Sequence, residues 1–171
     1  MENINALAVE IREIGLANGW NLLYRPDWTS SDYHVPAMLA LIHSEICEAH
    51  DAKFVGDMDD LAAEFADIVI RVLDMAGGLT EDFQAHYARV EGKFLSDDTE
   101  EAFNFLHAIT TYALEAFREG ELLKFLGSLA MLLHAVEHWA ADKFDIDMSV
   151  AVPEKMELNR HRSYRHGGKR V

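Results

Sequence analysis

The chain has 171 residues, about the size of one ordinary domain, and half of its residues are hydrophobic, which excludes disorder on composition. The formal net charge of −15 makes the chain as a whole repel a phosphate backbone, so nucleic acid is not an expected partner. No apolar stretch is long enough to span a membrane, no secretory signal begins the chain, and a single cysteine excludes an intrachain disulfide. These features predict a cytoplasmic protein with no membrane partner.

Apolar residues recur at helical spacing through most of the chain, and no segment alternates as a strand does, so the predicted fold class is all-α, a helical bundle. Asp59 or Asp60 is expected to cap the third helix, Gly77-Gly78 to end it and Pro153 to begin the last helix. The predicted helices cover about residues 4–18, 36–54, 59–77, 80–95, 100–119, 121–144 and 153–159.

The predicted organisation is one domain over residues 1–171. The hairpin over residues 36–77 is echoed by one over residues 100–144, so residues 96–150 are interpreted as an inserted hairpin or a degenerate repeat. Residues 153–171 form a basic C-terminal segment, with six Lys or Arg against two Glu. Such a segment can dock on the acidic body, bind a small anionic ligand or reach for nucleic acid.

Polar residues on the third predicted helix follow a single narrow stripe. They stand at positions 60, 64, 67, 71 and 74, steps of four and three that fall on one side of a helix, and the rest of the helix is mainly apolar. A helix of this kind is expected to be buried, and buried carboxylates must be paired, protonated or bound to metal. Arg71 cannot neutralise Glu64, Asp67 and Asp74 together.

A second acidic pair, Glu45 and Glu48, lies three residues apart on the preceding helix and therefore on one face. Four carboxylates on two neighbouring helices repel one another strongly without a cation. Ligands that are all oxygen favour Mg²⁺, Mn²⁺ or Ca²⁺ over zinc. Neither pair is Glu-x-x-His, which argues against a di-iron site.

The runs Glu45-Ile46-Cys47-Glu48 and Glu64-Phe65-Ala66-Asp67 resemble the signature of the all-α nucleotide pyrophosphatases, the group of MazG and the dimeric dUTPases. The chain looks most like the MazG-like proteins of phages and bacteria, in which a Gly-Trp pair follows the first helix, as Gly19-Trp20 does here. Their C-terminal region is similar to residues 155–169. The resemblance covers about the first 80 and the last 25 residues, and it departs at Ser44, where many relatives carry Glu.

The resemblance implies Mg²⁺-dependent hydrolysis of a nucleoside triphosphate to the monophosphate and pyrophosphate, with Mn²⁺ as an alternative ion, by a homodimer or higher homo-oligomer. It assigns Glu45, Glu48, Glu64 and Asp67 to the metal, with Glu45 and Glu48 also catalytic. The substrate-binding residues that we predict are Trp20, Asp74, Lys155, Asn159, Arg162, Tyr164, Arg165 and Lys169.

Several alternatives stay open at this point. The chain can be a non-catalytic helical protein that keeps a metal or nucleotide site for regulation, or residues 153–171 can form a nucleic-acid-binding module. His134-Ala135-Val136-Glu137-His138 matches a short zinc peptidase pattern without an apparent third ligand, and is interpreted as a satisfied or partly exposed histidine pair. Cys47 is interpreted as an inert buried thiol. The sequence does not identify the base of the nucleotide.

Overall fold

A computed structural model describes residues 1, 3–20, 28, 35–92, 96 and 98–164 of the chain. This part is helical and contains no strand, which confirms the all-α prediction. Its helices are α1 (Ile4–Ala17), α2 (Val35–Val55), α3 (Met58–Leu79), α4 (Phe83–Tyr87), α5 (Thr99–Arg118), α6 (Leu122–Phe144) and α7 (Met148–Arg160).

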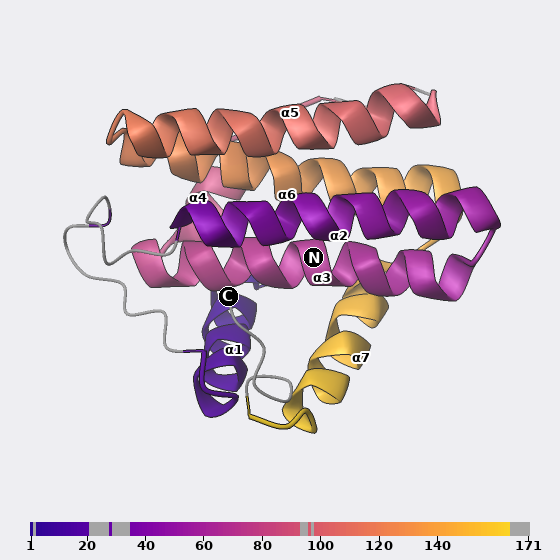
Figure 1. The fold of residues 1–171 in the computed structure, drawn as a ribbon. Helices are drawn as coiled ribbons and strands as arrows, with labels where there is room; N and C mark the ends of the chain where they lie inside the picture. Colours follow the sequence, from indigo (N-terminus) through magenta and orange to yellow (C-terminus); the bar gives the residue numbers. More distant parts are fainter. Residues whose placement is uncertain (2, 21–27, 29–34, 93–95, 97, 165–171) are drawn as a thin grey trace.

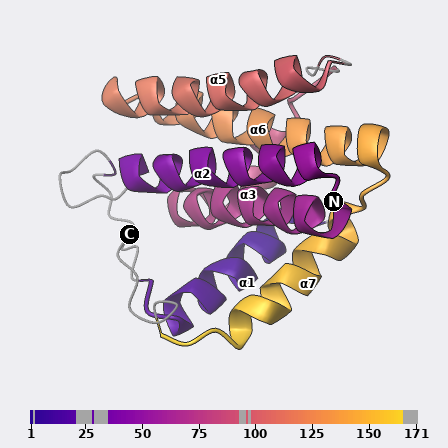
Figure 2. The same cartoon turned by 45° about the vertical axis from the view of Figure 1, so that its right-hand side comes forward.

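The helices form three layers (Figure 1). The hairpin of α2 and α3 lies in the middle, the hairpin of α5 and α6 packs on one side of it, and α1 and α7 lie on the other side. Turning the molecule shows α1 and α7 side by side, both slanting beneath α3 (Figure 2). The second hairpin therefore completes a four-helix bundle within one chain, since α2 contacts α5 and α3 contacts α6.

Helix α3 is the centre of the molecule, because it contacts α1, α2, α6 and α7. Phe65 is fully buried, and its ring lies 5.7 Å from Trp139, 5.9 Å from Phe144 and 6.5 Å from Phe103, measured between centroids. A helix that is covered on so many sides needs apolar residues nearly all round it. The prediction that α3 is buried, with one polar stripe, is confirmed.

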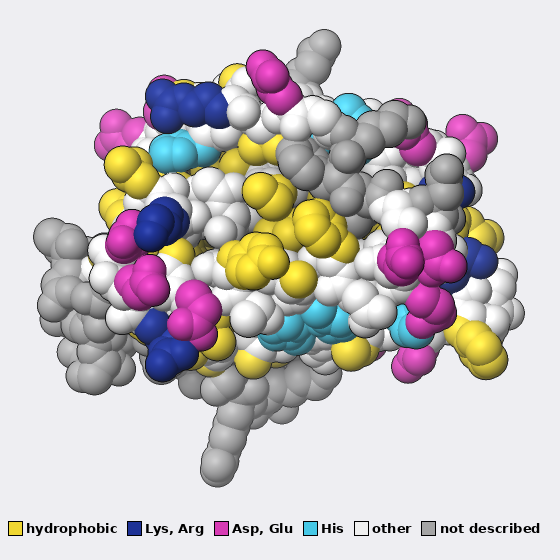
Figure 3. All heavy atoms as spheres, turned by 90° about the horizontal axis from the view of Figure 1, so that it is seen from above, with side chains coloured by type: hydrophobic (Ala, Val, Ile, Leu, Met, Phe, Trp, Pro, Cys, Tyr) yellow, Lys and Arg dark blue, Asp and Glu magenta, His cyan; other side chains and the backbone are white. Residues whose placement is uncertain are grey.

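Hydrophobic side chains are exposed on the outer surface on the α5 side. Hydrophobic side chains gather in its middle and acidic side chains lie toward its ends (Figure 3). Tyr112 is one exposed hydrophobic residue of α5.

Among the described residues, no helix combines the length and the apolar character that crossing a membrane requires.

The predicted boundaries of α3 were wrong at both ends. Its cap is Asp57, whose side chain accepts a hydrogen bond from the backbone N–H of Asp60, and not Asp59 or Asp60. The helix also continues through Gly77-Gly78 to Leu79. A Cβ at Gly77 would come within 3.2 Å of the Cβ of Ala8, so this glycine allows the close approach of α1 rather than ending the helix.

Two other predicted helices differ in extent. Among residues 80–92, the described part of the predicted 80–95 helix, only Phe83–Tyr87 is helical, because Thr80 is extended, Asp82 caps a new helix and Gly92 has a φ of +99°. Helix α7 begins at Met148, with Asp147 as its cap, so Pro153 lies inside the helix and does not start it. A proline there removes one backbone N–H, which the burial of the neighbouring Val152 and Met156 compensates.

The cap assignment predicts a stability difference between two neighbouring acids. Replacing Asp57 with Ala should lower the free energy of unfolding by about 1 kcal/mol, because the Asp60 N–H loses its acceptor. Asp59→Ala is the matched control, since Asp59 lies in the first turn of the same helix and is exposed. Urea unfolding followed by circular dichroism measures both, and a larger loss for Asp59→Ala would contradict the assignment.

Candidate functional site

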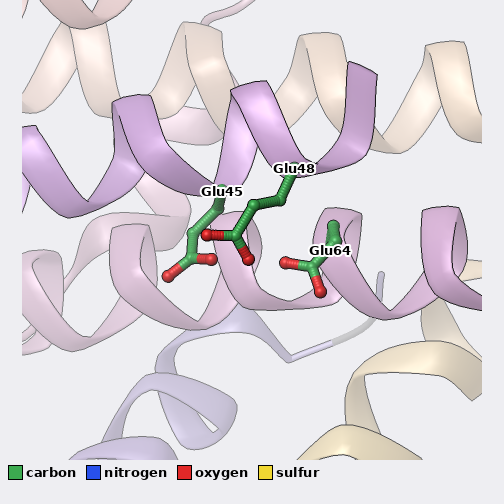
Figure 4. A group of neighbouring side chains, drawn as sticks. All are labelled: Glu45, Glu48 and Glu64. Atoms are coloured by element: carbon green, nitrogen blue, oxygen red, sulfur yellow. The ribbon is translucent and has the colours of Figure 1, made fainter. Parts of the chain in front are cut away.

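Three carboxylates from two helices meet between α2 and α3. Glu45 and Glu48 extend from α2 and Glu64 extends from α3, and one oxygen of each lies within 4.8 Å of the others (Figure 4). We refer to these three residues as the acidic triad. In the described part of the chain, it is the one group of three His, Cys, Asp or Glu side chains whose ligand atoms all already lie this close to one another.

The ionised form of Glu64 is disfavoured in this arrangement. It is 8% exposed, and its Oε2 is buried without a hydrogen-bond partner. Burial raises the pKa of Glu64 to about 7; Lys155 opposes this rise, and Asp67, Glu45 and Glu48 add to it. A buried oxygen that lacks a donor, among like charges, is stabilised by a cation.

Two basic residues partly neutralise the acids. Arg71, one and two turns from Asp67 and Glu64 on α3, places its Nε and an Nη 2.9 Å from Oε1 of Glu45. Lys155 of α7 lies 2.7 Å from Asp67 and 4.0 Å from Glu64, measured from its Nζ to the carboxylate oxygens. The structure thus gathers three of the four predicted metal ligands, while Asp67 lies beside them and pairs with Lys155.

Glu48 differs from the rest of the triad because it is exposed. The hydroxyl of Ser44 donates a hydrogen bond to its Oε1 over 3.1 Å. Ser44 thus orients the exposed carboxylate of Glu48.

A pocket of about 80 Å³ adjoins the acids between α1, α2, α3 and α7. Its apolar wall includes Ile14, Met38 and Leu41, and its polar wall includes Asp67 and Arg71. The structure brings four of the predicted substrate-binding residues to this pocket. They are Trp20, Asp74, Asn159 and Arg162.

Asn159 and Asp74 are two polar residues of the pocket whose burial affects how they could bind a ligand. Oδ1 of Asn159 is buried without a hydrogen-bond partner. Burial raises the pKa of Asp74 to about 6, against the lowering effect of Arg12 and Arg71. The carboxylate of Asp74 lies 3.9 Å from Arg12, a residue of α1 that the sequence did not indicate because an isolated Arg has no distinguishing spacing.

The end of α7 and Tyr164 contact the end of α1. The side-chain amide of Asn18 donates to the backbone carbonyl of Asn159 over 2.8 Å. Gly19 has a φ of +83°, and a Cβ there would overlap the ring of Tyr164. Gly19 is therefore required by its backbone conformation and by this contact. Of the remaining predicted residues, Lys155 lies at the acids, and Arg165 and Lys169 lie outside the described residues.

Two other sequence motifs have clear outcomes. His134 and His138 stack with their ring centroids 4.1 Å apart, and His134 is half-buried and His138 exposed, which fits the interpretation as a partly exposed pair. Cys47 is exposed, so the prediction of a buried thiol was wrong. The residue before it, Ile46, is buried, but successive helical residues point in different directions.

Comparisons of the chain with known protein families, with curated proteins and with solved structures found no match.

Proposed function

We propose that this protein is a Mg²⁺-dependent hydrolase that converts a nucleoside triphosphate to the monophosphate and pyrophosphate. The observation that carries the proposal is the meeting of Glu45, Glu48 and Glu64 beside a pocket with mixed polar and apolar walls. The residues fit a hard divalent cation, because the donors are all oxygens and Oε2 of Glu64 is buried without a partner.

Each acid would have a role in metal binding or proton transfer that depends on its exposure and its partners. Glu45, Glu48 and Glu64 would hold the cation, and Asp67 would join them if Lys155 moved from it. A bound Mg²⁺ supplies charge neutralisation at phosphate oxygens and orientation of a water. Glu48 is exposed and oriented by Ser44, so it is the carboxylate that we assign to accept the proton of the attacking water.

The pocket would bind part of the base, because its volume of about 80 Å³ is too small for a whole nucleoside. Trp20 offers an aromatic face for a base, and Asn159 offers a buried acceptor oxygen to the edge of that base. Arg162 lines the same pocket and can bind phosphate as a charged donor fork. Lys155 lies near enough to the acids to contact a phosphate once it leaves Asp67.

The direct experiment is a substrate panel. The purified chain is incubated with each ribonucleoside and deoxyribonucleoside triphosphate in Mg²⁺, and phosphorus NMR identifies the products. We expect equal amounts of monophosphate and pyrophosphate from at least one substrate, and no turnover with EDTA. Release of inorganic phosphate with a diphosphate product would contradict cleavage between the α and β phosphates.

A second candidate function is a non-catalytic metal-binding or nucleotide-binding regulatory protein. The ion pairs of Arg71 with Glu45 and of Lys155 with Asp67 favour it, because they stabilise the acids without a metal. Nucleotide and Mn²⁺ binding without any pyrophosphate from the whole panel would support this function and not hydrolysis. The predicted homodimer stays a prediction, testable by light scattering.

The ion pair of Lys155 also predicts how strongly the acids bind metal. Replacing Lys155 with Met should tighten Mn²⁺ binding about 10-fold, equivalent to about 1.4 kcal/mol, because a competing cation 2.7 Å from Asp67 is removed. Lys124→Met is the control, since Lys124 pairs with Glu121 on the surface of α6. Calorimetric titration measures both, and weaker binding by Lys155→Met would show that Lys155 does not compete.

A further inference from the structure

A second cluster of metal-ligating side chains lies on the opposite face of α2, along its contact with α5. Cys47, His43 and His50 are spaced by four and three residues on α2, so they share one face. His107 of α5 lies against them: its Nδ1 is 2.7 Å from Nδ1 of His43, and its Nε2 is 3.8 Å from Sγ of Cys47. None of these residues has a role in the hydrolysis proposed above.

The contact between His43 and His107 allows the nitrogen that faces the thiol to be unprotonated. Two imidazole nitrogens 2.7 Å apart require that one donates and the other accepts. When Nδ1 of His107 donates to His43, Nε2 of His107 is the unprotonated nitrogen, and it is the atom that lies beside Cys47. A histidine that binds metal commonly donates its other ring N–H to a partner in this way.

His50 has the same arrangement with a carboxylate. Its Nε2 lies 2.8 Å from Oε1 of Glu100, so its Nδ1 is the nitrogen left to bind a ligand. His50 is also close enough to His107 to lower the pKa of that imidazole, after the larger effect of burial and together with His43. Histidine side chains reach the surface on the α5 side of the molecule (Figure 3).

We infer that Cys47 and His107 bind a transition-metal ion of the zinc class, that His50 turns toward them as the third ligand, and that His43 positions His107. Ligands at zinc bond lengths of about 2.3 Å for sulfur and 2.0 Å for nitrogen stand about 3.5 Å apart in a tetrahedral site. The sulfur and nitrogen here are already 3.8 Å apart. Thiolate and imidazole select such an ion over Mg²⁺, so this site is chemically distinct from the acidic triad.

The test uses Co²⁺ as a spectroscopic probe on the purified, metal-stripped full chain in excess Mg²⁺. A cobalt–thiolate bond gives a near-ultraviolet charge-transfer band, which Co²⁺ at the acidic triad cannot give because that site has oxygen ligands alone. We expect one equivalent of Co²⁺ to produce the band and Zn²⁺ to remove it. No band, or a band that survives in Cys47→Ser, would overturn the proposal.

Further variants separate ligands from the positioning residue. His107→Gln and His50→Gln should each weaken Co²⁺ binding by at least about 10-fold, whereas His43→Gln should keep the band with affinity reduced about 10-fold. His161→Gln, at the exposed end of α7, is the control and should change nothing. Unchanged affinity in His107→Gln would overturn the proposal.

A measurement on the unaltered chain makes the test independent of whether the variants fold. Cys47 is the single cysteine, so alkylation by iodoacetamide reports on this one residue. Zn²⁺ should slow the alkylation and Mg²⁺ should not. Equal alkylation rates with and without Zn²⁺ would contradict the site.

Discussion

Replacing Glu48 with Gln is expected to lower the rate of nucleoside triphosphate hydrolysis by about 10²- to 10⁴-fold, the usual contribution of a positioned general base. Glutamine keeps the size of the side chain and can still accept the hydrogen bond from Ser44, but it cannot take a proton from water. The rate of pyrophosphate release at saturating Mg²⁺ and substrate measures the effect. Because Glu48 is exposed, the substitution should leave the fold intact.

Glu115→Gln is the matched control for this experiment, since Glu115 is exposed on α5 and pairs with Arg118. It should keep the full rate. Turnover in Glu48→Gln equal to that of the unaltered chain would show that another group accepts the proton. If Asp67→Asn were also fully active, the carboxylates would have no part in the reaction.

The acidic face of each helix could be predicted from the sequence because helical periodicity is local. Residues 60, 64, 67, 71 and 74 fall on one side of any α-helix, whatever packs against it. The pairing of the two faces was a weaker prediction. It required α2 and α3 to lie side by side, and the short connection at Gly56-Asp57 makes that arrangement the natural one.

The partners of the acids could not be predicted, because they come from distant parts of the chain. Lys155 meets Asp67 across 88 positions, and the sequence suggested only in general terms that the basic segment can dock on the acidic body, bind a small anionic ligand or reach for nucleic acid. Its position follows from how α7 packs on α3, with Val152 and Met156 buried. Spacing within one helix contains no information about such a contact.

The ends of the helices and the exposure of single residues also could not be predicted from local sequence patterns. Three acids, Asp57, Asp59 and Asp60, are all good caps by residue type, and only the backbone path decides that Asp57 accepts the hydrogen bond. Cys47 follows the buried Ile46 in the chain, yet helical rotation turns it outward. The sequence predicted the type of each long helix well and its first and last residues poorly.

The unusual pKa of Glu64 predicts that the metal-free protein loses stability as the pH rises. The folded state holds the Glu64 proton up to about pH 7, whereas the unfolded chain releases it near the ordinary value of 4.5. Between these values the folded state binds more protons, so each increase in pH lowers the free energy of unfolding. The total change is about 3 kcal/mol, at about 1.4 kcal/mol for each pKa unit.

Glu64→Gln removes this ionisation and keeps the shape of the side chain. In EDTA, the unaltered chain should lose about 3 kcal/mol more than Glu64→Gln between pH 4 and pH 8, measured by urea unfolding. Asp74 adds a similar dependence between its ordinary pKa of 3.8 and about 6, but it is present in both proteins and cancels in the difference. Equal pH dependence of the two proteins would contradict the raised pKa.

Adding a divalent ion should reverse the order of the two proteins at pH 8. The ionised Glu64 then has a cation to stabilise it, so Mn²⁺ should raise the stability of the unaltered chain by an amount that grows with the logarithm of its concentration. Glu64→Gln should gain much less, because its amide cannot supply the charge. An equal gain by both proteins would place the ion away from Glu64 and remove the main support for the acidic triad as a metal site.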